Sequence, residues 1–256
     1  MLECSQLKDS DWRVRHDALK ALGKLGPETL AQHASAVVAR LEDSNSDVRY
    51  AALETLGKLD TATLAQHAKA VVARVEDSEL VVCLMAMDTL AKLEPMTLAQ
   101  QAGVVAARLE DSEWYVREAA LVTLGKLEPA TLAQHADAVV ARLEDSLEYM
   151  RATALTTLGN LDPATLARHA FAVVARLEDP TVLVRQMACQ ALEMLPRYVR
   201  HATRGVDCEE LQSRALDHGE VEELRSRLLG RVAWYRCRIR LRVRSLLLYW
   251  YALPYR

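Results

Sequence analysis

Apolar residues recur along most of this chain at the spacing of amphipathic helices. In the stretch that follows residue 45, the apolar positions are Val48, Ala52, Leu53, Leu56 and Leu59. Steps of three and four residues place such side chains on one face of an α-helix. The pattern therefore predicts a helix whose apolar face packs against a neighbour.

A second apolar stripe, formed by Leu30, Ala34, Val37, Val38 and Leu41, predicts another helix. It begins with the hexapeptide TLAQHA, whose identical or close copies occupy residues 29–34, 63–68, 97–102, 131–136 and 165–170. Self-similarity at a fixed period is typical of repeat proteins. Here the period is 34 residues, and six repeats begin near Leu7, Leu41, Val75, Leu109, Leu143 and Leu177.

Each repeat thus predicts two short helices, and such a hairpin buries its apolar face only by stacking on its neighbours. We therefore expect an all-α fold, a right-handed α-solenoid of about six two-helix repeats over residues 1–205. Residues 206–256 depart from the repeat and form a divergent C-terminal extension.

Residues at the predicted helix ends suit those positions. Asp43-Ser44 offers an N-cap for the first helix, and Gly57 stands near its C-terminus. The spacing of Thr29 and Gln32 is that of a capping box at the start of the second helix. A cation closes the second helix in five repeats, at Arg40, Arg74, Arg108, Arg142 and Arg176.

Composition narrows the class of protein. The five cysteines are an odd number without C-x-x-C spacing, which disfavours a disulfide framework or a zinc site and favours an intracellular, cytoplasmic location. We recognise no signal peptide and no apolar run of about 20 residues. Residues 1–196 carry 19 basic and 28 acidic residues, whereas residues 197–256 carry 13 arginines and 7 acidic residues.

The motif D-S-x-x-x-V-R-x-A-A-L resembles HEAT repeats, in particular the short type of the phycobilisome lyases. That resemblance implies a polar ladder of aspartate and arginine that links neighbouring repeats. The pairs that match are Asp9/Arg15, Asp43/Arg49, Asp111/Arg117, Asp145/Arg151 and Asp179/Arg185. Repeat 3 departs from the motif, because Cys83 stands where the arginine after Asp77 is expected.

The recurring histidine raises the question of a metal or catalytic site. It occurs as His33, His67, His135 and His169, with Gln101 in repeat 3. Repeats stacked about 10 Å apart cannot bring these rings around one ion, whose ligands lie about 2 Å away. We interpret the histidine as a packing residue and predict no catalytic residue, no metal and no cofactor.

Two enzyme families contain such repeats. Deoxyhypusine hydroxylase holds two irons through His-Glu pairs, and no histidine of this chain is followed by glutamate. A bilin lyase, or a subunit of one, remains an alternative function, because no missing motif excludes it.

The positions just after Asp-Ser vary among repeats, as expected of a surface that contacts a partner. They include large aromatic residues of the kind enriched at interaction hot spots. A further variable position lies on the second helix. The candidate partner-binding residues are Trp12, Trp114, Tyr115, Tyr149 and Phe171.

The extension contains an amphipathic stretch, residues 207–235, that can cap the last repeat. Beyond it, arginines alternate with apolar residues at the period of a strand. They are Arg236, Arg238, Arg240, Arg242 and Arg244. Such a basic tail with nearby aromatic residues can bind RNA or an anionic membrane, which gives a second alternative function. Our main hypothesis is a non-enzymatic scaffold or adaptor that binds other proteins.

Overall fold

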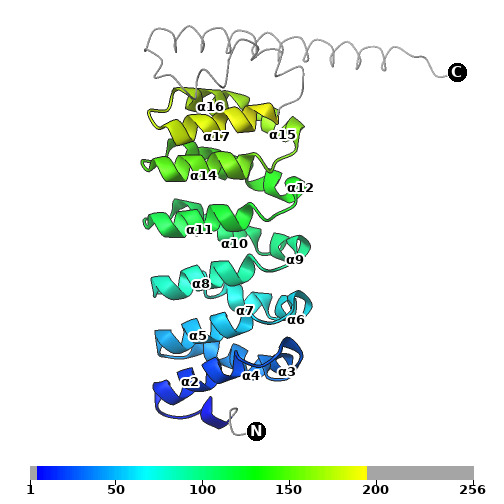
Figure 1. Cartoon of the computed structure of the whole chain (residues 1–256), viewed down its shortest axis with the longest axis vertical. Coiled ribbons are helices and arrows are strands. Elements are labelled where there is room, and N and C mark those ends of the chain that lie inside the picture. The colour runs from blue at the N-terminus through cyan, green and yellow to red at the C-terminus, as the bar shows by residue number, and fades with distance from the viewer. Residues whose placement is uncertain (1–4, 195–256) are drawn as a thin grey trace, which may run out of the picture. The chain divides into compact units, whose positions relative to one another are not determined.

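The computed structural model describes residues 5–194, and the described residues form helices and turns without a strand (Figure 1). This confirms the all-α prediction. The chain divides into two compact units, residues 1–139 and 140–256. The predicted capping helix and the basic tail lie outside the described residues, as do Cys4, Cys208 and Cys237.

In the first unit, the first helix of each repeat packs on the first helix of the next repeat (Figure 1). This series consists of α2 (Trp12–Leu22), α5 (Ser46–Leu56), α8 (Leu80–Leu90) and α11 (Trp114–Leu124). In the second unit, α14 (Glu148–Leu158) packs on α17 (Val182–Glu193) in the same way. Stacking of successive helical pairs is the architecture of an α-solenoid, as predicted.

The predicted second helix is interrupted in each of the five repeats in which the structure describes it. Repeat 1 has α3 (Pro27–Ala31) and α4 (Ala34–Val38), which meet at His33, and the 3-10 turn η1 (Ala39–Glu42) follows. His33 adopts φ −107° and ψ −1°, outside helical geometry. The apolar spacing continues through the break, because the departure from helical geometry is confined to a short stretch. Leu30, Ala34, Val37 and Leu41 are therefore all buried.

The same interruption recurs along the chain. The segments of repeats 2 and 3 are α6 (Thr61–Gln66), α7 (Ala68–Val72), α9 (Pro95–Ala99), α10 (Ala102–Ala107) and η2 (Arg108–Glu110). Those of repeat 4 are α12 (Pro129–Leu132), η3 (Ala133–His135), α13 (Ala136–Ala141) and η4 (Arg142–Glu144). Those of repeat 5 are α15 (Pro163–Arg168), α16 (Ala170–Ala175) and η5 (Arg176–Glu178).

The first helices start one residue later than the Asp-Ser motif predicts. Asn45 is the N-cap of α5, and its side chain accepts from the backbone N–H groups of Asp47 and Val48. Asp43 instead accepts from the N–H of Asn45 at 3.1 Å, a turn that leads the chain into the helix. The corresponding aspartate makes this bond in all six repeats.

The capping-box prediction is wrong. The N-cap of α6 is Asp60, whose carboxylate accepts from Thr63 N–H at 2.9 Å and from the Thr63 hydroxyl at 2.7 Å. The threonine of the TLAQHA motif thus lies inside the first turn. Asp162 caps α15 in the same way, ahead of a proline at the first helical position.

The glycines that follow the first helices of repeats 1 and 2 are not left-handed helix caps and instead lie close to the next repeat. Gly57 has φ −66° and ψ −3°, which any residue adopts, so no left-handed cap is present here. A Cβ atom at Gly57 would lie 2.9 Å from Nζ of Lys92, and one at Gly23 would lie 3.1 Å from Nζ of Lys58. At these two positions the glycine makes room for a lysine of the next repeat.

Candidate functional site: surfaces of the repeats

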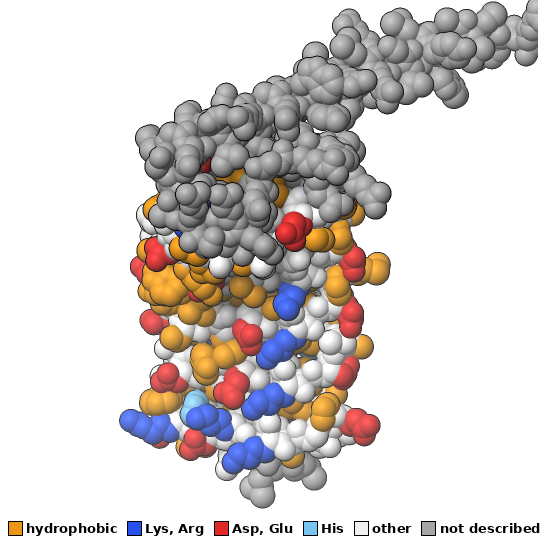
Figure 2. Space-filling view, turned by 45° about the horizontal axis from the view of Figure 1, so that its top comes forward, with side chains coloured by type: hydrophobic (Ala, Val, Ile, Leu, Met, Phe, Trp, Pro, Cys, Tyr) orange, Lys and Arg blue, Asp and Glu red, His pale blue; other side chains and the backbone are white. Residues whose placement is uncertain are grey.

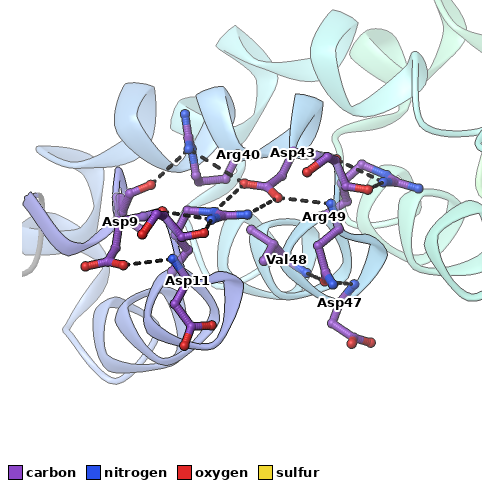
Figure 3. A network of polar contacts seen from close by, with 12 residues as sticks. Asp9, Asp11, Arg40, Asp43, Asp47, Val48 and Arg49 are labelled. Atoms are coloured by element: carbon purple, nitrogen blue, oxygen red, sulfur yellow. Dashed lines mark hydrogen bonds and ion pairs between the residues drawn. The ribbon is translucent and has the colours of Figure 1, made fainter.

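Bidentate ion pairs join successive repeats (Figure 3). Nε and Nη2 of Arg15 donate to the two carboxylate oxygens of Asp43, each at 2.7 Å. Nη1 of the same arginine donates to the backbone carbonyls of Asp9 and Ser10. This arginine therefore holds the loop of its own repeat and the aspartate 28 residues further on.

The same geometry recurs in both units. Arg49 binds Asp77 at 2.7 and 2.8 Å, and Arg151 binds Asp179 at 2.6 and 2.8 Å. The side chains of these aspartates are 3% exposed. We call these three pairs, with Arg15–Asp43 as the first, the Asp–Arg ladder.

The ladder corrects the pairing of residues six apart that the resemblance implied. Arg117 and Arg185 were expected to pair with Asp111 and Asp179. Instead, Nη1 of Arg117 donates to the backbone carbonyl of Asp111 at 2.9 Å, and Nη1 of Arg185 donates to that of Asp179 at 2.8 Å. The carboxylate of Asp179 is bound by Arg151 of the preceding repeat. Residues six apart are thus joined through the main chain, because the arginine folds back over the loop that starts its own helix.

Arg117 and Arg185 hold their own loops in the same way as the ladder arginines. Each also donates to the next carbonyl along the chain, Arg117 to Ser112 and Arg185 to Pro180, both at 3.0 Å. Both arginines are half-buried. The position 28 residues after Arg185 is residue 213, outside the described residues. The hydrogen bonds of Arg185 described above therefore lie within its own repeat.

Burial and ion pairing act in opposite directions on the ladder aspartates. Burial raises the pKa of Asp43, but the hydrogen bonds from Arg15 and Asn45 and the charges of Arg15 and Arg40 outweigh it. The pKa of Asp43 is therefore lowered. The pKa values of Asp77 and Asp179 are shifted in the same direction for the same reasons. These carboxylates are ionised at neutral pH and hold the repeats together.

The ladder changes at repeat 3. Cys83 is 5% exposed, and its thiol donates to the carbonyl of Val75 at 3.0 Å. Burial raises the pKa of this thiol to about 11. Asp111, which lies 28 residues after Cys83, forms an ion pair with Arg108 at 3.5 Å, and its side chain is 21% exposed. This carboxylate is thus more open than those of Asp43, Asp77 and Asp179, whose side chains are 3% exposed.

A second row of arginines reinforces the contacts between repeats, a role that the sequence pattern had assigned only to the helix dipole. Nη1 of Arg40 donates to the carbonyl of Leu7 at 2.9 Å, and Nη1 of Arg176 donates to that of Leu143 at 2.8 Å. Arg74 repeats this bond and also contacts Glu42 at 3.3 Å. The recurrence of these arginines every 34 residues is the sequence feature from which this role could have been predicted.

The recurring histidines do not assemble into a site. They are half-buried and lie at the break between the two short helices in repeats 1, 2, 4 and 5. Burial lowers the pKa of His135. Within residues 5–194, no group of three histidine, cysteine, aspartate or glutamate side chains is arranged to hold a metal ion.

The candidate partner-binding residues differ in exposure. Trp114 is 44% exposed and Tyr149 is 50% exposed, both in the first turn of a first helix. Tyr115 is half-buried, with its ring centroid 5.2 Å from that of Trp114. Trp12 is also half-buried, under the guanidinium of Arg13 at 4.9 Å. Phe171 is half-buried as well.

A row of lysines was missed at the sequence level. It follows the last turn of each first helix in the first unit and consists of Lys24, Lys58, Lys92 and Lys126, all exposed. Figure 2 shows a line of basic side chains across this face, with acidic side chains on both sides. The signal was present in the recurring LGKL motif, which was interpreted only as a helix end. We call these four residues the lysine row.

Comparisons with known proteins agree with this architecture. Residues 4–87 match the family model of HEAT repeats. This match spans the first two repeats and the beginning of the third. No curated protein matches the sequence significantly. Within the described part of the chain, no helix is long and apolar enough to cross a membrane.

Solved structures of engineered proteins share the fold at low sequence identity. A computationally designed armadillo repeat protein for modular peptide recognition is 17% identical with a TM-score of 0.62, covering 76% of this chain and 99% of that one. A designed armadillo repeat protein in complex with the peptide (KR)4 is 17% identical with a TM-score of 0.53, covering 90% and 98%. Another engineered protein is 14% identical with a TM-score of 0.62, covering 75% and 94%.

Proposed function

We propose that this protein is a non-enzymatic scaffold that binds other proteins through the exposed face of its HEAT-like repeats. The observation that carries the proposal is the contrast between constant and variable positions within each repeat. Ladder and core residues are nearly constant, whereas the first turn of each first helix varies and carries exposed side chains. A constant frame with variable exposed positions is typical of repeat proteins that bind partners.

The exposed apolar side chains on these first turns support the proposal. In the second unit they are Leu147, Tyr149, Val182 and Leu183, which are 38–50% exposed. In the first unit Val81 and Trp114 are 53% and 44% exposed. Large apolar side chains grouped on a surface mark interaction sites more often than scattered ones do. The designed armadillo proteins, one of which is bound to a peptide, give a precedent for this use of the fold.

The test is capture of partners by the full chain and by the double variant Trp114→Ala/Tyr149→Ala. A matched control is Met96→Ala/Val122→Ala, which removes two apolar side chains that are 82% and 47% exposed and lie away from the first turns. Quantitative mass spectrometry should show partners reduced about fivefold or more by the first variant, and retained by the control. Equal capture by all three proteins would contradict the proposal.

A further inference from the structure

The lysine row has a geometry that suits a partner of defined chemistry. We propose that it binds an extended acidic peptide that carries a carboxylate at every third residue. This inference rests on the proposed function and assigns a second contact region to the same scaffold. It concerns only the first unit, residues 1–139.

The ammonium groups are held at regular positions. Nζ of Lys58 lies over Gly23, and Nζ of Lys92 lies over Gly57, close enough that a Cβ atom would meet them at 3.1 and 2.9 Å. Each of these lysines thus rests on the C-terminal end of the first helix in the preceding repeat, where the helix dipole favours a cation. The row therefore places one ammonium group per repeat.

The lysines keep the capacity to bind an anion. Lys58 pairs with Glu54 at 3.3 Å and Lys92 with Asp88 at 3.2 Å, yet the two lysine side chains remain 44% and 45% exposed. Exposed pairs of this kind are weak, and an ammonium group has three donors. At the ends of the row, the positions four residues earlier hold Lys20 and Val122 instead of a carboxylate.

The flanks of the row exclude a broad polyanion. Glu54 and Asp88 lie four residues before Lys58 and Lys92. The N-cap acids Asp60, Glu94 and Glu128 follow Lys58, Lys92 and Lys126 by two residues, and Figure 2 shows acidic side chains on both sides of the basic line. A nucleic acid duplex, a membrane or a helix about 10 Å wide would meet these carboxylates. A single extended chain is narrow enough to follow the lysines alone.

The spacing of the row selects the conformation of that chain. Packed helices lie about 8–10 Å apart, so successive ammonium groups follow at about that interval. A polyproline II chain has three residues per turn and rises about 9 Å per turn. Carboxylates at every third residue of such a chain then face successive lysines, whereas a β-strand repeats each face every two residues, after about 7 Å.

The experiment measures fluorescence anisotropy of labelled (Glu-Pro-Pro)4 with the full chain at low ionic strength. We compare it with (Glu-Pro)6, which has the same length and more charge but the wrong period. The proposal expects tighter binding of (Glu-Pro-Pro)4. Equal or tighter binding of (Glu-Pro)6 would overturn it, because charge alone, including that of the C-terminal arginines, would then explain the affinity.

A pair of charge-matched variants locates the site. Lys58→Gln/Lys92→Gln should weaken binding of (Glu-Pro-Pro)4 roughly 3- to 10-fold, while Lys8→Gln/Lys69→Gln should leave it unchanged. Equal effects of the two variants, no binding at about 1 mM protein, or tighter row-dependent binding of an oligouridine each overturn the proposal. None of these results touches the capture experiment with Trp114 and Tyr149, so the two proposals fail separately.

Discussion

Arg15 and Asp43 are 28 residues apart in the chain and form a buried bidentate ion pair, with both N–O distances at 2.7 Å. The arginine also donates to two carbonyls in its own repeat. One side chain therefore orders the loop that starts its helix and fixes the position of the following repeat. This contact joins repeats 1 and 2, and the pair of Arg49 with Asp77 joins repeats 2 and 3 in the same way.

Removal of one ladder arginine should destabilise the fold strongly. In Arg49→Ala, the carboxylate of Asp77 stays buried without its partner, and we expect a loss of about 3 kcal/mol in the free energy of unfolding. Arg13→Ala is the control, because its side chain is 71% exposed, and it should cost less than about 0.5 kcal/mol. Urea denaturation followed by circular dichroism measures both, and similar losses would contradict the structural role of the ladder.

Stability should fall in acid because of the ladder. The folded-state pKa values of Asp43, Asp77 and Asp179 lie below their ordinary value, so their stabilising effect is complete above about pH 4. It is lost as the pH falls from there through the folded-state pKa values. Urea midpoints between about pH 7 and pH 3 should show this decline. Asp77→Asn should start lower at neutral pH and decline less, and a parallel decline would count against this origin.

Repeat 3 offers a gain-of-stability test. Cys83→Arg places the missing arginine opposite Asp111, and the completed pair should raise the free energy of unfolding by about 1 kcal/mol. Asp111→Asn in the Cys83→Arg background is the control, since it removes the acceptor charge and should cancel the gain. If the single variant is less stable than the parent protein, the space around Cys83 does not admit the longer side chain.

The thiol of Cys83 should react slowly in the folded protein. Its pKa of about 11, raised by burial, lowers the thiolate fraction near neutral pH about 100-fold relative to a thiol with a pKa of about 9. Pulse alkylation with iodoacetamide, followed by peptide mass spectrometry, reports Cys83 separately from the other cysteines. Labelling should become fast only after denaturation, and fast labelling of the native chain would show that the site opens.

Gly57→Ala should stabilise the protein. The backbone at Gly57 is right-handed, so alanine gains roughly 0.4–1 kcal/mol by restricting the unfolded chain. The Cβ atom would displace only the flexible end of Lys92. Repeat 3 already has Ala91 at this position. Thermal denaturation tests the gain, and an unchanged or lower midpoint would contradict it.

Periodicity predicted the repeats and the two apolar stripes because burial against neighbours imposes the same side chains every 34 residues. It did not predict the break at His33, because a short departure from helical geometry leaves the apolar spacing unchanged. It also misplaced the helix starts. Asp43 and Thr63 are both suitable capping residues, and only their hydrogen bonds show that Asn45 and Asp60 occupy the caps.

The sites were less predictable than the fold. The ladder residues were named from a resemblance, which paired Asp179 with Arg185, whereas the carboxylate binds Arg151. Pairing across 28 residues depends on the stacking distance between helices, which no local pattern contains. The lysine row was overlooked for a different reason. Its lysines look like ordinary solvated residues in a single repeat, and they become a surface feature only when successive repeats are aligned in space.

The 28-residue reach of the ladder also sets a rule for how such a chain can change in length. Excision of residues 41–74 would bring Asp77 to the place of Asp43, within reach of Arg15, and every cap and apolar contact would find an equivalent. Within the helices, a loss or gain that is not a multiple of 34 residues would leave an arginine facing the wrong partner. Duplication and deletion of whole 34-residue modules are therefore the changes in length that this architecture tolerates.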